Sequence, residues 1–309
     1  MTAPALVVMA AGIGSRYGGI KQIDPIGPNG EILLDYAVYD ALQVGFERVV
    51  FVIRKEIEST FRAKAEPTIE KRTHVDYVLQ SLDALPEGFS APPGRVKPWG
   101  TAHAVLLCEK AVEGPFAAIN ADDFYGREAF AALYEFLRDV DDGASPLPIC
   151  NVVYRIENTL TEHGTVSRGV CSVSPDGILE NIVERKRVRP SGSGVVYLDE
   201  EDRPVELPSG CFVSMNMWGF PRSVFSELGR RFTGFLRAHR DDLTRAEALL
   251  PEVVADLIRE GRAEVRVLPT ESRWFGVTYP EDKDRVKRAI RALIASGAYP
   301  ESLWNEPIE

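Results

Sequence analysis

Two cations and four glycines stand in one short segment near the start of the chain, immediately after the apolar run of residues 6–11. Glycine allows left-handed backbone conformations that bring N–H groups close to a ligand, and consecutive amides curled in this way form an anion-binding concavity. Fixed cations beside such a concavity suit a polyphosphate. The pattern predicts a site for a nucleoside triphosphate, built from Gly12, Gly14, Arg16, Gly18, Gly19 and Lys21.

The segment differs from two better-known glycine motifs. A dinucleotide-binding fingerprint requires G-x-G-x-x-G, but Tyr17 occupies the position of the third glycine. The P-loop pattern G-x-x-x-x-G-K-[ST] occurs nowhere in the chain. A glycine-rich turn with a purely structural role is the remaining alternative.

The complete string, A-A-G-x-G-x-R followed by K-Q, resembles the signature of nucleotidyltransferases that act on sugar phosphates and related alcohol phosphates. The resemblance implies that Arg16 contacts the β- and γ-phosphates, where a planar guanidinium suits bidentate contact. It also implies that Lys21 bridges the α-phosphate and the sugar phosphate. The backbone amides of residues 11–15 would complete the phosphate cradle, which then includes Ala11, Gly12, Gly14 and Ser15.

Two consecutive carboxylates, Asp122 and Asp123, follow the strand expected at residues 116–120. Buried carboxylates are costly unless they meet a cation or solvent, and Mg²⁺ is typically held by one or two carboxylates together with substrate phosphates. The segment resembles the strand end at which the family binds Mg²⁺, and Asp122 matches the metal-binding Asp. Asp123 is either a second Mg²⁺ ligand or a cap or surface residue before the helix expected from residue 127, and we favour the second interpretation.

A nucleobase site is expected from two further segments. Residues 77–80 resemble the family's base-reading strand, on which Gln80 contacts a pyrimidine, and a primary amide offers a donor and an acceptor. Gly100 and Thr101 match the family's G-T-A segment, whose glycine lets the base lie close. The loop of residues 82–98 between them is longer than the family usually has. Its four prolines exclude regular structure, and its length indicates a lid or binding element.

Three segments in the second half of the chain resemble the family's acceptor-binding elements. In the family, a glycine backbone and a Glu followed by a cation bind sugar hydroxyls and phosphate. These positions match Gly164, Glu184 and Arg185. Lys186 is the alternative to Arg185 as the cation. The segment of residues 214–220 resembles the family's sugar-binding strand and points to Asn216.

One departure from the family concerns the metal. Residues 274–282 resemble the family's W-x-D-x-x-x-P-E-D motif, but Gly276 stands where the family has a second Mg²⁺-binding Asp. The replacement implies a cation held by Asp122, phosphates and water, or with help from Asp123.

Alternating strands and helices must position these residues. Their order in the first half indicates a parallel sheet with helices on both faces. Ligands in such sheets bind beyond the carboxyl ends of the strands, and the glycine segment, Gln80 and Asp122 all follow such ends. His103 falls on a predicted helix, where packing or a surface position is more common than ligand contact. Strands are expected at residues 5–10, 48–53, 74–79 and 116–120, and helices at 33–44, 56–64, 101–112 and 127–140.

The resemblance covers nearly the whole chain. It implies one α/β domain of nucleotide-diphospho-sugar transferase type, with a mostly parallel central sheet. Residues 1–145 would form the nucleotide-binding half, and residues 146–309 a strand-rich acceptor-binding half with the C-terminal helices. In this second half, strands are expected at residues 151–156, 164–173, 178–185, 194–198, 211–220 and 263–268, and helices at 221–239, 247–260 and 281–295.

The composition excludes several other classes of protein. A net charge of −10 argues against a nucleic-acid-binding surface, because phosphate backbones require clustered Lys and Arg. The cysteines are widely spaced without a C-x-x-C pair, so neither a zinc site nor a disulfide framework is expected. No apolar run approaches the roughly 18 residues of a membrane span, and the first run lacks the basic flank of a signal peptide. We expect a cytoplasmic protein without nucleic-acid or membrane partners.

The resemblance implies nucleotidyl transfer from an NTP, by preference UTP or dTTP, to a sugar 1-phosphate, with an NDP-sugar and pyrophosphate as products and Mg²⁺ as cofactor. Such transfer depends on positioning and charge neutralisation more than on an acid–base pair. One alternative is a glycosyltransferase of related fold that uses a finished nucleotide sugar, although it has no need of Arg16 and Lys21. The other is a non-catalytic nucleotide-sugar-binding protein, which only Gly276 favours.

Overall fold

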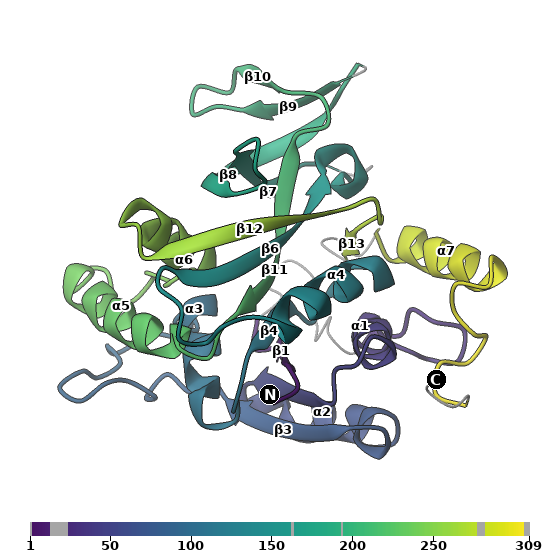
Figure 1. The fold of residues 1–309 in the computed structure, drawn as a ribbon, viewed down its shortest axis with the longest axis horizontal. Coiled ribbons are helices and arrows are strands. Elements are labelled where there is room, and N and C mark those ends of the chain that lie inside the picture. The colour runs from purple at the N-terminus through teal and green to yellow at the C-terminus, as the bar shows by residue number, and fades with distance from the viewer. Residues whose placement is uncertain (1, 13–23, 162–163, 193, 277–281, 306–309) are drawn as a thin grey trace.

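The computed structural model describes residues 2–12, 24–161, 164–192, 194–276 and 282–305. Within these residues, one sheet of eleven strands runs through both predicted halves of the chain (Figure 1). The first half contains β1 (Ala5–Met9), α1 (Leu33–Gln43), β2 (Arg48–Ile53), α2 (Glu58–Ala65), β3 (His74–Leu79), α3 (Thr101–Leu106), β4 (Phe116–Asn120), β5 (Asp123–Phe124) and α4 (Arg127–Arg138). The second half contains β6 (Leu147–Arg155), β7 (Val166–Val173), β8 (Leu179–Ser191), β9 (Gly194–Leu198), β10 (Pro204–Leu207), β11 (Phe212–Phe220), α5 (Val224–Ala238), α6 (Leu250–Arg259), β12 (Ala263–Thr270), β13 (Phe275–Gly276) and α7 (Asp282–Ala295). Short 3₁₀ helices lie at Lys55–Ile57, Ile69–Lys71, Leu107–Lys110 and Ile156–Thr159.

Parallel pairing joins the strands of the first half. Val7 of β1 lies opposite Val50 of β2 on one side and Ala118 of β4 on the other, and β3 pairs with the far side of β2. The second half joins this sheet through β11, which pairs antiparallel with β4, β6 and β7. β12 runs parallel to β6. The strand order is β10-β9-β8-β7-β11-β4-β1-β2-β3, with β6 and β12 branching from β11.

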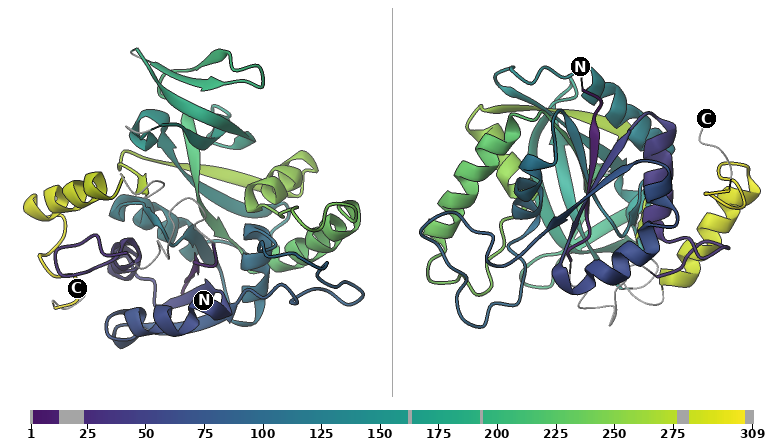
Figure 2. Two further views of the ribbon diagram at one scale, coloured as in Figure 1. Left: turned by 180° about the vertical axis from the view of Figure 1, so that it is seen from behind. Right: turned by 90° about the horizontal axis from the view of Figure 1, so that it is seen from below.

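Side chains that alternate along β1 enter two separate apolar cores. Leu6 and Val8 pack in the core that contains α1, α2 and α4, whereas Val7 and Met9 pack in the core that contains α3, α5 and α6. All side chains of β1 are buried, because a parallel strand covered by helices on both faces has no solvent side. In the view from below, the green helices and the purple helix α1 lie on opposite sides of the strands (Figure 2). The predicted α/β class, a central parallel sheet with helices on both faces, is confirmed.

The parallel strands bring distant segments to one edge of the sheet. The backbone N–H of Ala121 donates to Met9 O at 3.2 Å, and that of Gln80 donates to Ile53 O at 2.8 Å. The segments that follow β4, β1, β2 and β3 therefore leave the sheet side by side, at the edge where ligands of open α/β sheets bind. The described residues Ala11, Gly12, Gln80 and Asp122 all leave the sheet there.

The predicted bounds agree best for the parallel strands, since β2, β3 and β4 begin and end at the expected residues. The helix expected at residues 101–112 ends as an α-helix at Leu106 and continues as a 3₁₀ helix. The short strands β5, β10 and β13 carry too few alternating residues to be predicted. No helix in the described part of the chain is long and apolar enough to span a membrane.

The loop of residues 82–98 contains no helix or strand, as its prolines predict, and it packs against the second half of the chain. The buried guanidinium of Arg95 lies 3.6 Å from the Trp99 ring centroid and donates to Ala246 O at 3.0 Å. The Trp99 indole donates to Leu82 O at 2.8 Å. These contacts hold the loop at both its start and its end, and its role as a lid stays a prediction.

Gly100, just before α3, lies where the backbones of the two halves meet. Its φ of 103° is in the left-handed region, and a Cβ there would lie 2.3 Å from Ala248 O. The same carbonyl accepts the backbone N–H of Ala102 at 3.0 Å, and Thr101 Oγ1 accepts the N–H of Leu250 at 2.8 Å. A glycine is therefore required by backbone packing, whether or not a base lies close to it.

We expect Gly100→Ala to lower the free energy of unfolding by on the order of 3 kcal/mol or more, because it adds a steric clash to a left-handed conformation. Gly94→Ala is the matched control, since Gly94 has a φ of 81° but nothing within 4 Å of its Cβ position. It should cost only about 1–2 kcal/mol. Urea unfolding of the two variants measures the difference, and equal costs would contradict the packing role of Gly100.

Candidate functional site

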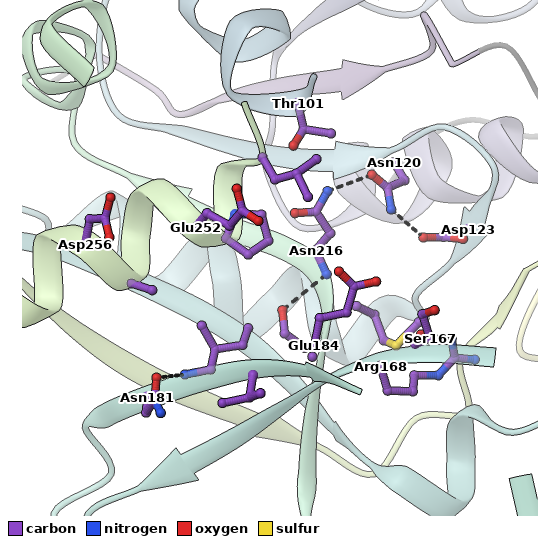
Figure 3. A pocket seen from close by; sticks show the side chains of 18 of the residues that line it. Thr101, Asn120, Asp123, Ser167, Arg168, Asn181, Glu184, Asn216, Glu252 and Asp256 are labelled. Atoms are coloured by element: carbon purple, nitrogen blue, oxygen red, sulfur yellow. Dashed lines mark hydrogen bonds between the residues drawn. The ribbon is translucent and has the colours of Figure 1, made fainter. Parts of the chain in front are cut away.

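A cavity of about 780 Å³ lies beyond the carboxyl end of β4 (Figure 3). Its volume is in the range of small-molecule sites, roughly 300–1,000 Å³. Strands β4, β7, β8 and β11 supply one part of its wall, and the start of α3 and one face of α6 supply another. The polar side chains labelled in Figure 3 are Thr101, Asn120, Asp123, Ser167, Arg168, Asn181, Glu184, Asn216, Glu252 and Asp256.

Four residues predicted from the sequence meet in this cavity. Thr101 comes from the start of α3, Asp123 from β5, Glu184 from β8 and Asn216 from β11. These elements are far apart in the chain, and only the sheet brings them together. Polar side chains that converge on one concave site are the usual arrangement of a small-molecule site.

The remaining predicted residues lie elsewhere. Ala11 is buried at the end of β1 and Gly12 is exposed beyond it. Asp122 is half-buried between β4 and β5 and is not among the described residues that line the cavity. Gly164 lies ahead of β7 with a φ of 72°. The part of the phosphate cradle formed by Gly14, Ser15, Arg16 and Lys21 falls outside the described residues and stays a prediction.

Asp123 is neither a helix cap nor a surface residue, so the interpretation favoured from the sequence is wrong. The N-cap residue of α4 is Gly126, so no side chain caps this helix. Asp123 lies in β5, where it pairs with Gly276 of β13, and is 7% exposed. Its Oδ2 accepts hydrogen bonds from Asn120 Nδ2 at 2.8 Å and from the Tyr125 hydroxyl at 3.2 Å. A contact between distant segments, rather than the local turn, decides its position.

Asn216 lies at an irregularity of β11, with a φ of 60°, which is uncommon for a residue other than glycine. Its Nδ2 donates to Asn120 Oδ1 at 2.8 Å, and its Oδ1 accepts the Trp218 indole N–H at 2.9 Å. A chain of hydrogen bonds thus runs from Trp218 to Asp123, and its last two links are drawn in Figure 3. Asn216 lines the cavity, but the protein already engages both ends of its amide. This favours a role in orienting neighbours over direct contact with a sugar.

The predicted cation Arg185 does not enter the cavity. Its guanidinium lies 4.7 Å from the centroid of the Tyr197 ring, and neither Arg185 nor Lys186 is among the described residues that line the cavity. Glu184 is the last of four consecutive residues of β8 that line the cavity, so the described wall ends just before Arg185.

A buried cation from the neighbouring strand, Arg168 of β7, lines the cavity instead. Its Nε donates to Thr159 Oγ1 at 3.0 Å, and its guanidinium lies 4.7 Å from the Trp274 ring centroid. Burial lowers the pKa of Arg168 to about 10, against the opposing effect of the negative charge of Asp123. Arg168 therefore stays charged at neutral pH. Exposed polar residues accompany Arg168 in β7. The sequence therefore does not distinguish Arg168 from an ordinary surface cation.

Glu252 and Asp256 of α6 also line the cavity, and the sequence did not reveal them. Burial raises the pKa of Glu252, and the negative charges of Glu184 and Asp256 raise it further. In a sequence, two acidic residues one helical turn apart usually indicate a solvated helix face. Only the fold shows that they line the same cavity as Glu184 of β8. Carboxylates accept hydrogen bonds from hydroxyl groups, and this wall therefore suits a polyhydroxylated ligand.

Gln80 follows β3, is 7% exposed and is held by two hydrogen-bond acceptors. Its Nε2 donates to Gly100 O at 3.0 Å and lies 3.2 Å from His103 Nδ1. His103 Nε2 lies 2.7 Å from Ala84 O, which can only accept. Nε2 of the imidazole thus carries the proton, and Nδ1 accepts from Gln80. The amide oxygen of Gln80 points away from both partners, and no hydrogen bond reaches it from the described part of the chain.

His103 has the packing role that the sequence favours. It is fully buried and stacks on Phe232 with ring centroids 4.7 Å apart. Burial lowers the pKa of the imidazole to about 4, although the hydrogen bond to Ala84 O opposes the shift. The neutral ring therefore fixes the orientation of the Gln80 amide at physiological pH.

Compared by sequence, the chain matches no protein-family model and no curated protein. Solved structures that share its fold include a protein from Bacillus anthracis described as a glucose-1-phosphate thymidylyltransferase, in complex with sucrose (TM-score 0.60, 15% identity, 94% of this chain and 96% of that chain). They also include an inositol-1-phosphate CTP transferase from T. maritima (TM-score 0.59, 14% identity, 95% and 97%). A third is a UDP-glucose pyrophosphorylase in complex with UDP-glucose (TM-score 0.57, 15% identity, 94% and 99%). The fold implied by the sequence resemblance is thereby confirmed.

We expect His103 to titrate with a midpoint near pH 4. Because its pKa in the folded protein lies below the ordinary value of 6.5, the neutral ring contributes stability that is present above pH 6.5 and is lost as the pH falls through about 4. NMR titration of the histidine resonances, with His103→Gln to assign the signal, measures this midpoint. A midpoint at or above pH 6 would contradict the neutral, buried imidazole and the orientation of Gln80 derived from it.

Proposed function

We propose that this chain transfers a nucleotidyl group from UTP or dTTP to a sugar 1-phosphate, giving an NDP-sugar and pyrophosphate. The observation that carries the proposal is the position of Ala11 and Gly12, the described start of the glycine segment, which follow β1 at the same sheet edge as the cavity. The names of the solved structures with this fold, a thymidylyltransferase, a CTP transferase and a pyrophosphorylase, support this reading. The proposal takes residues 1–309 as one catalytic domain and places it in the cytoplasm.

An in-line displacement at the α-phosphorus accounts for the reaction. An oxygen of the sugar phosphate attacks the α-phosphorus. The bond between the α-phosphorus and the oxygen that bridges it to the β-phosphorus breaks, and pyrophosphate leaves on the opposite side. Positioning and charge neutralisation are the main requirements of such a step. Arg16 would contact the β- and γ-phosphates and the leaving pyrophosphate. Lys21 would bridge the α-phosphate and the sugar phosphate, and loop amides beyond Ala11 would complete the cradle.

A divalent cation fits the residues beyond β4. Asp122 and Asp123 offer carboxylate oxygens, which Mg²⁺ prefers, and Mg²⁺ sites typically use only one or two carboxylates with phosphates and water. No group of three or more His, Cys, Asp or Glu side chains among the described residues is arranged so that it could hold a metal ion, so the other ligands in this proposal are phosphates and water. Asp122 is assigned as the main protein ligand. When bound, the cation supplies charge neutralisation at the phosphates.

The polar wall of the cavity would bind the acceptor. Sugar hydroxyls can donate hydrogen bonds to Glu184 and Glu252 and can also accept from the amide of Asn181. The charged guanidinium of Arg168 lies on the same wall and favours a negatively charged ligand nearby. A polyol that carries a phosphate therefore matches the cavity better than an apolar alcohol.

Gln80 would select the base through its amide oxygen. Because its nitrogen is engaged by Gly100 O and His103, the group that Gln80 can offer a ligand is a hydrogen-bond acceptor. Uracil and thymine carry an N–H at position 3, whereas cytosine carries an acceptor there. The orientation of the amide therefore supports UTP or dTTP over CTP.

We expect the purified protein to release pyrophosphate from UTP or dTTP in the presence of Mg²⁺ and a sugar 1-phosphate. A coupled pyrophosphate assay over all NTPs and a panel of sugar 1-phosphates measures this. Arg16→Ala and Lys21→Ala should each lower kcat by on the order of 100-fold or more, as loss of a preorganised donor does. Lys110→Ala, on the exposed surface of the 3₁₀ helix after α3, is the matched control.

Near-normal turnover in a folded Arg16→Ala or Lys21→Ala variant would contradict the mechanism. Glycosyl transfer from an NDP-sugar without pyrophosphate release would identify a glycosyltransferase instead. Binding of NDP-sugars without either reaction would identify a non-catalytic protein.

Base selection gives a separate test. Gln80→Ala should lower the ratio of kcat/KM values for UTP over CTP, and for pyrimidine over purine triphosphates, by about 10-fold or more, because a polar site discriminates through its hydrogen bonds. Steady-state kinetics with each triphosphate measures the ratios. A wild-type preference for a purine triphosphate would show that Gln80 does not read a pyrimidine.

A further inference from the structure

Gly276 and Asp123 are direct partners in the short ribbon of β5 and β13. A Cβ at position 276 would lie 2.8 Å from Asp123 Oδ1 and 2.8 Å from the ring of Trp274. Such distances are too short for a real side chain, so one group must move if position 276 carries a Cβ. The carboxylate of Asp123 therefore occupies the space into which a side chain at position 276 would extend.

Hydrogen bonds hold the Asp123 carboxylate by its other oxygen. Oδ2 accepts from Asn120 Nδ2 at 2.8 Å and from the Tyr125 hydroxyl at 3.2 Å. Asn120 is held in turn by Asn216 Nδ2, at 2.8 Å, and Asn216 by the indole of Trp218, at 2.9 Å. Trp218 is fully buried. This chain of hydrogen bonds from Trp218 through Asn216 and Asn120 therefore connects the Asp123 carboxylate to the protein core.

The backbone of Asn216 is adapted to this chain of hydrogen bonds. β11 shifts its register against β6 between Ser214 and Met217, and Asn216 takes a left-handed φ of 60° there. A residue other than glycine keeps such a conformation where its surroundings determine it, and residues of this kind gather at functional sites. Here the conformation directs the side-chain amide at Asn120, on the neighbouring strand.

We propose that Asp123 supplies the second carboxylate for the divalent cation in place of a side chain at position 276, and that Asn120 and Asn216 are positioning residues that aim it. The inference rests on the proposed function for the presence of a cation. Hydrogen-bond partners of a ligating carboxylate fix its orientation and typically change metal affinity 10–100-fold when they are lost. Asp122 and Asp123 then form the protein's part of the cation site.

Mn²⁺ binding to the full-length protein tests the inference without catalysis. Electron paramagnetic resonance of free Mn²⁺ gives the Kd in the presence of the α,β-methylene analogue of UTP. Asp123→Asn should weaken binding by about 10-fold or more. Asn216→Gly accepts a left-handed φ without strain but removes the amide, and it should weaken binding by about 10-fold. Asp176→Asn, in the exposed turn between β7 and β8, is the charge-matched control and should bind as the wild type does.

Two double variants distinguish the effect of the carboxylate on Mn²⁺ binding from the effect of packing at positions 123 and 276. Asp123→Ala removes the oxygen nearest to position 276, and combining it with Gly276→Asp returns a carboxylate from β13 to the same space once the ring of Trp274 shifts, a shift that any Cβ at this position requires. This double variant should regain at least about 3-fold of the affinity lost in Asp123→Ala. The double variant Asp123→Ala with Gly276→Ala adds only a methyl group and should regain none. Circular dichroism establishes that each variant is folded before its Kd is compared.

Unchanged Mn²⁺ affinity in Asp123→Asn would overturn the inference, even if the wild-type protein releases pyrophosphate. Equal recovery in the two double variants, or no Mn²⁺ binding by the wild type, would also overturn it. If Asp123→Asn loses Mn²⁺ binding but the wild type releases no pyrophosphate with any substrate pair, the cation site stands and the proposed function fails.

Discussion

The arrangement of the whole site depends on how β1 pairs with its two neighbours. The parallel register of Val7 with Val50 and Ala118 sets the carboxyl ends of three strands level with one another. The backbone bonds from Ala10 to Val52 and from Ala121 to Met9 extend this pairing past the last ladder residues. Beyond them the chain leaves the sheet in adjacent segments. Ala11 and Gly12, where the glycine segment begins, therefore leave the sheet beside the segment that carries the pair of carboxylates, although about a hundred residues separate them in the sequence.

The second half of the chain joins the central strands of the first through the antiparallel pairing of β11 with β4. Trp218 of β11 lies opposite Ala118 of β4. If this register is continued for two residues, position 216 lies opposite position 120, beyond the last backbone pair of β11 and β4. There the side-chain amides of Asn216 and Asn120 form a hydrogen bond. Strand β11 also pairs with β7, which brings Arg168 and the neighbouring Glu184 of β8 to the same cavity. One register therefore joins the part assigned to the cation with the part assigned to the sugar.

Much of the fold could be predicted because local patterns determine it. Short apolar runs predict β2 and β4 to the residue, as the bounds of β3 were also predicted, and the prolines exclude regular structure from residues 82–98. Asp123 could not be predicted, because its position depends on pairing with Gly276, about 150 residues further along the chain. The left-handed conformation of Asn216 leaves no trace in the composition of β11.

The exclusion of Arg185 could not be predicted from the sequence. Consecutive residues of β8 up to Glu184 line the cavity, so the alternation of side chains along a strand does not by itself separate Glu184 from the residue after it. The family pattern supplied residue types without their surroundings, and the structure places Arg185 over Tyr197 instead. Positive charge in the wall comes from Arg168 of the neighbouring strand, at a position that no motif marks, and from Arg259 at the end of α6.

The distribution of charge in the cavity orients the proposed acceptor. Glu184 and Glu252 stand close enough for their charges to interact, and this repulsion adds to the rise in the pKa of Glu252. A phosphate placed between them would suffer the same repulsion, whereas hydroxyl groups would relieve it by donating hydrogen bonds. In the proposed binding mode, the sugar ring of a sugar 1-phosphate would therefore lie on the side of α6 and β8. Its phosphate would point toward β4, where Arg168 of β7 and a cation held near Asp123 would neutralise its charge. The attacking oxygen would then face the sheet edge at which β1 ends, as the proposed nucleotidyl transfer requires.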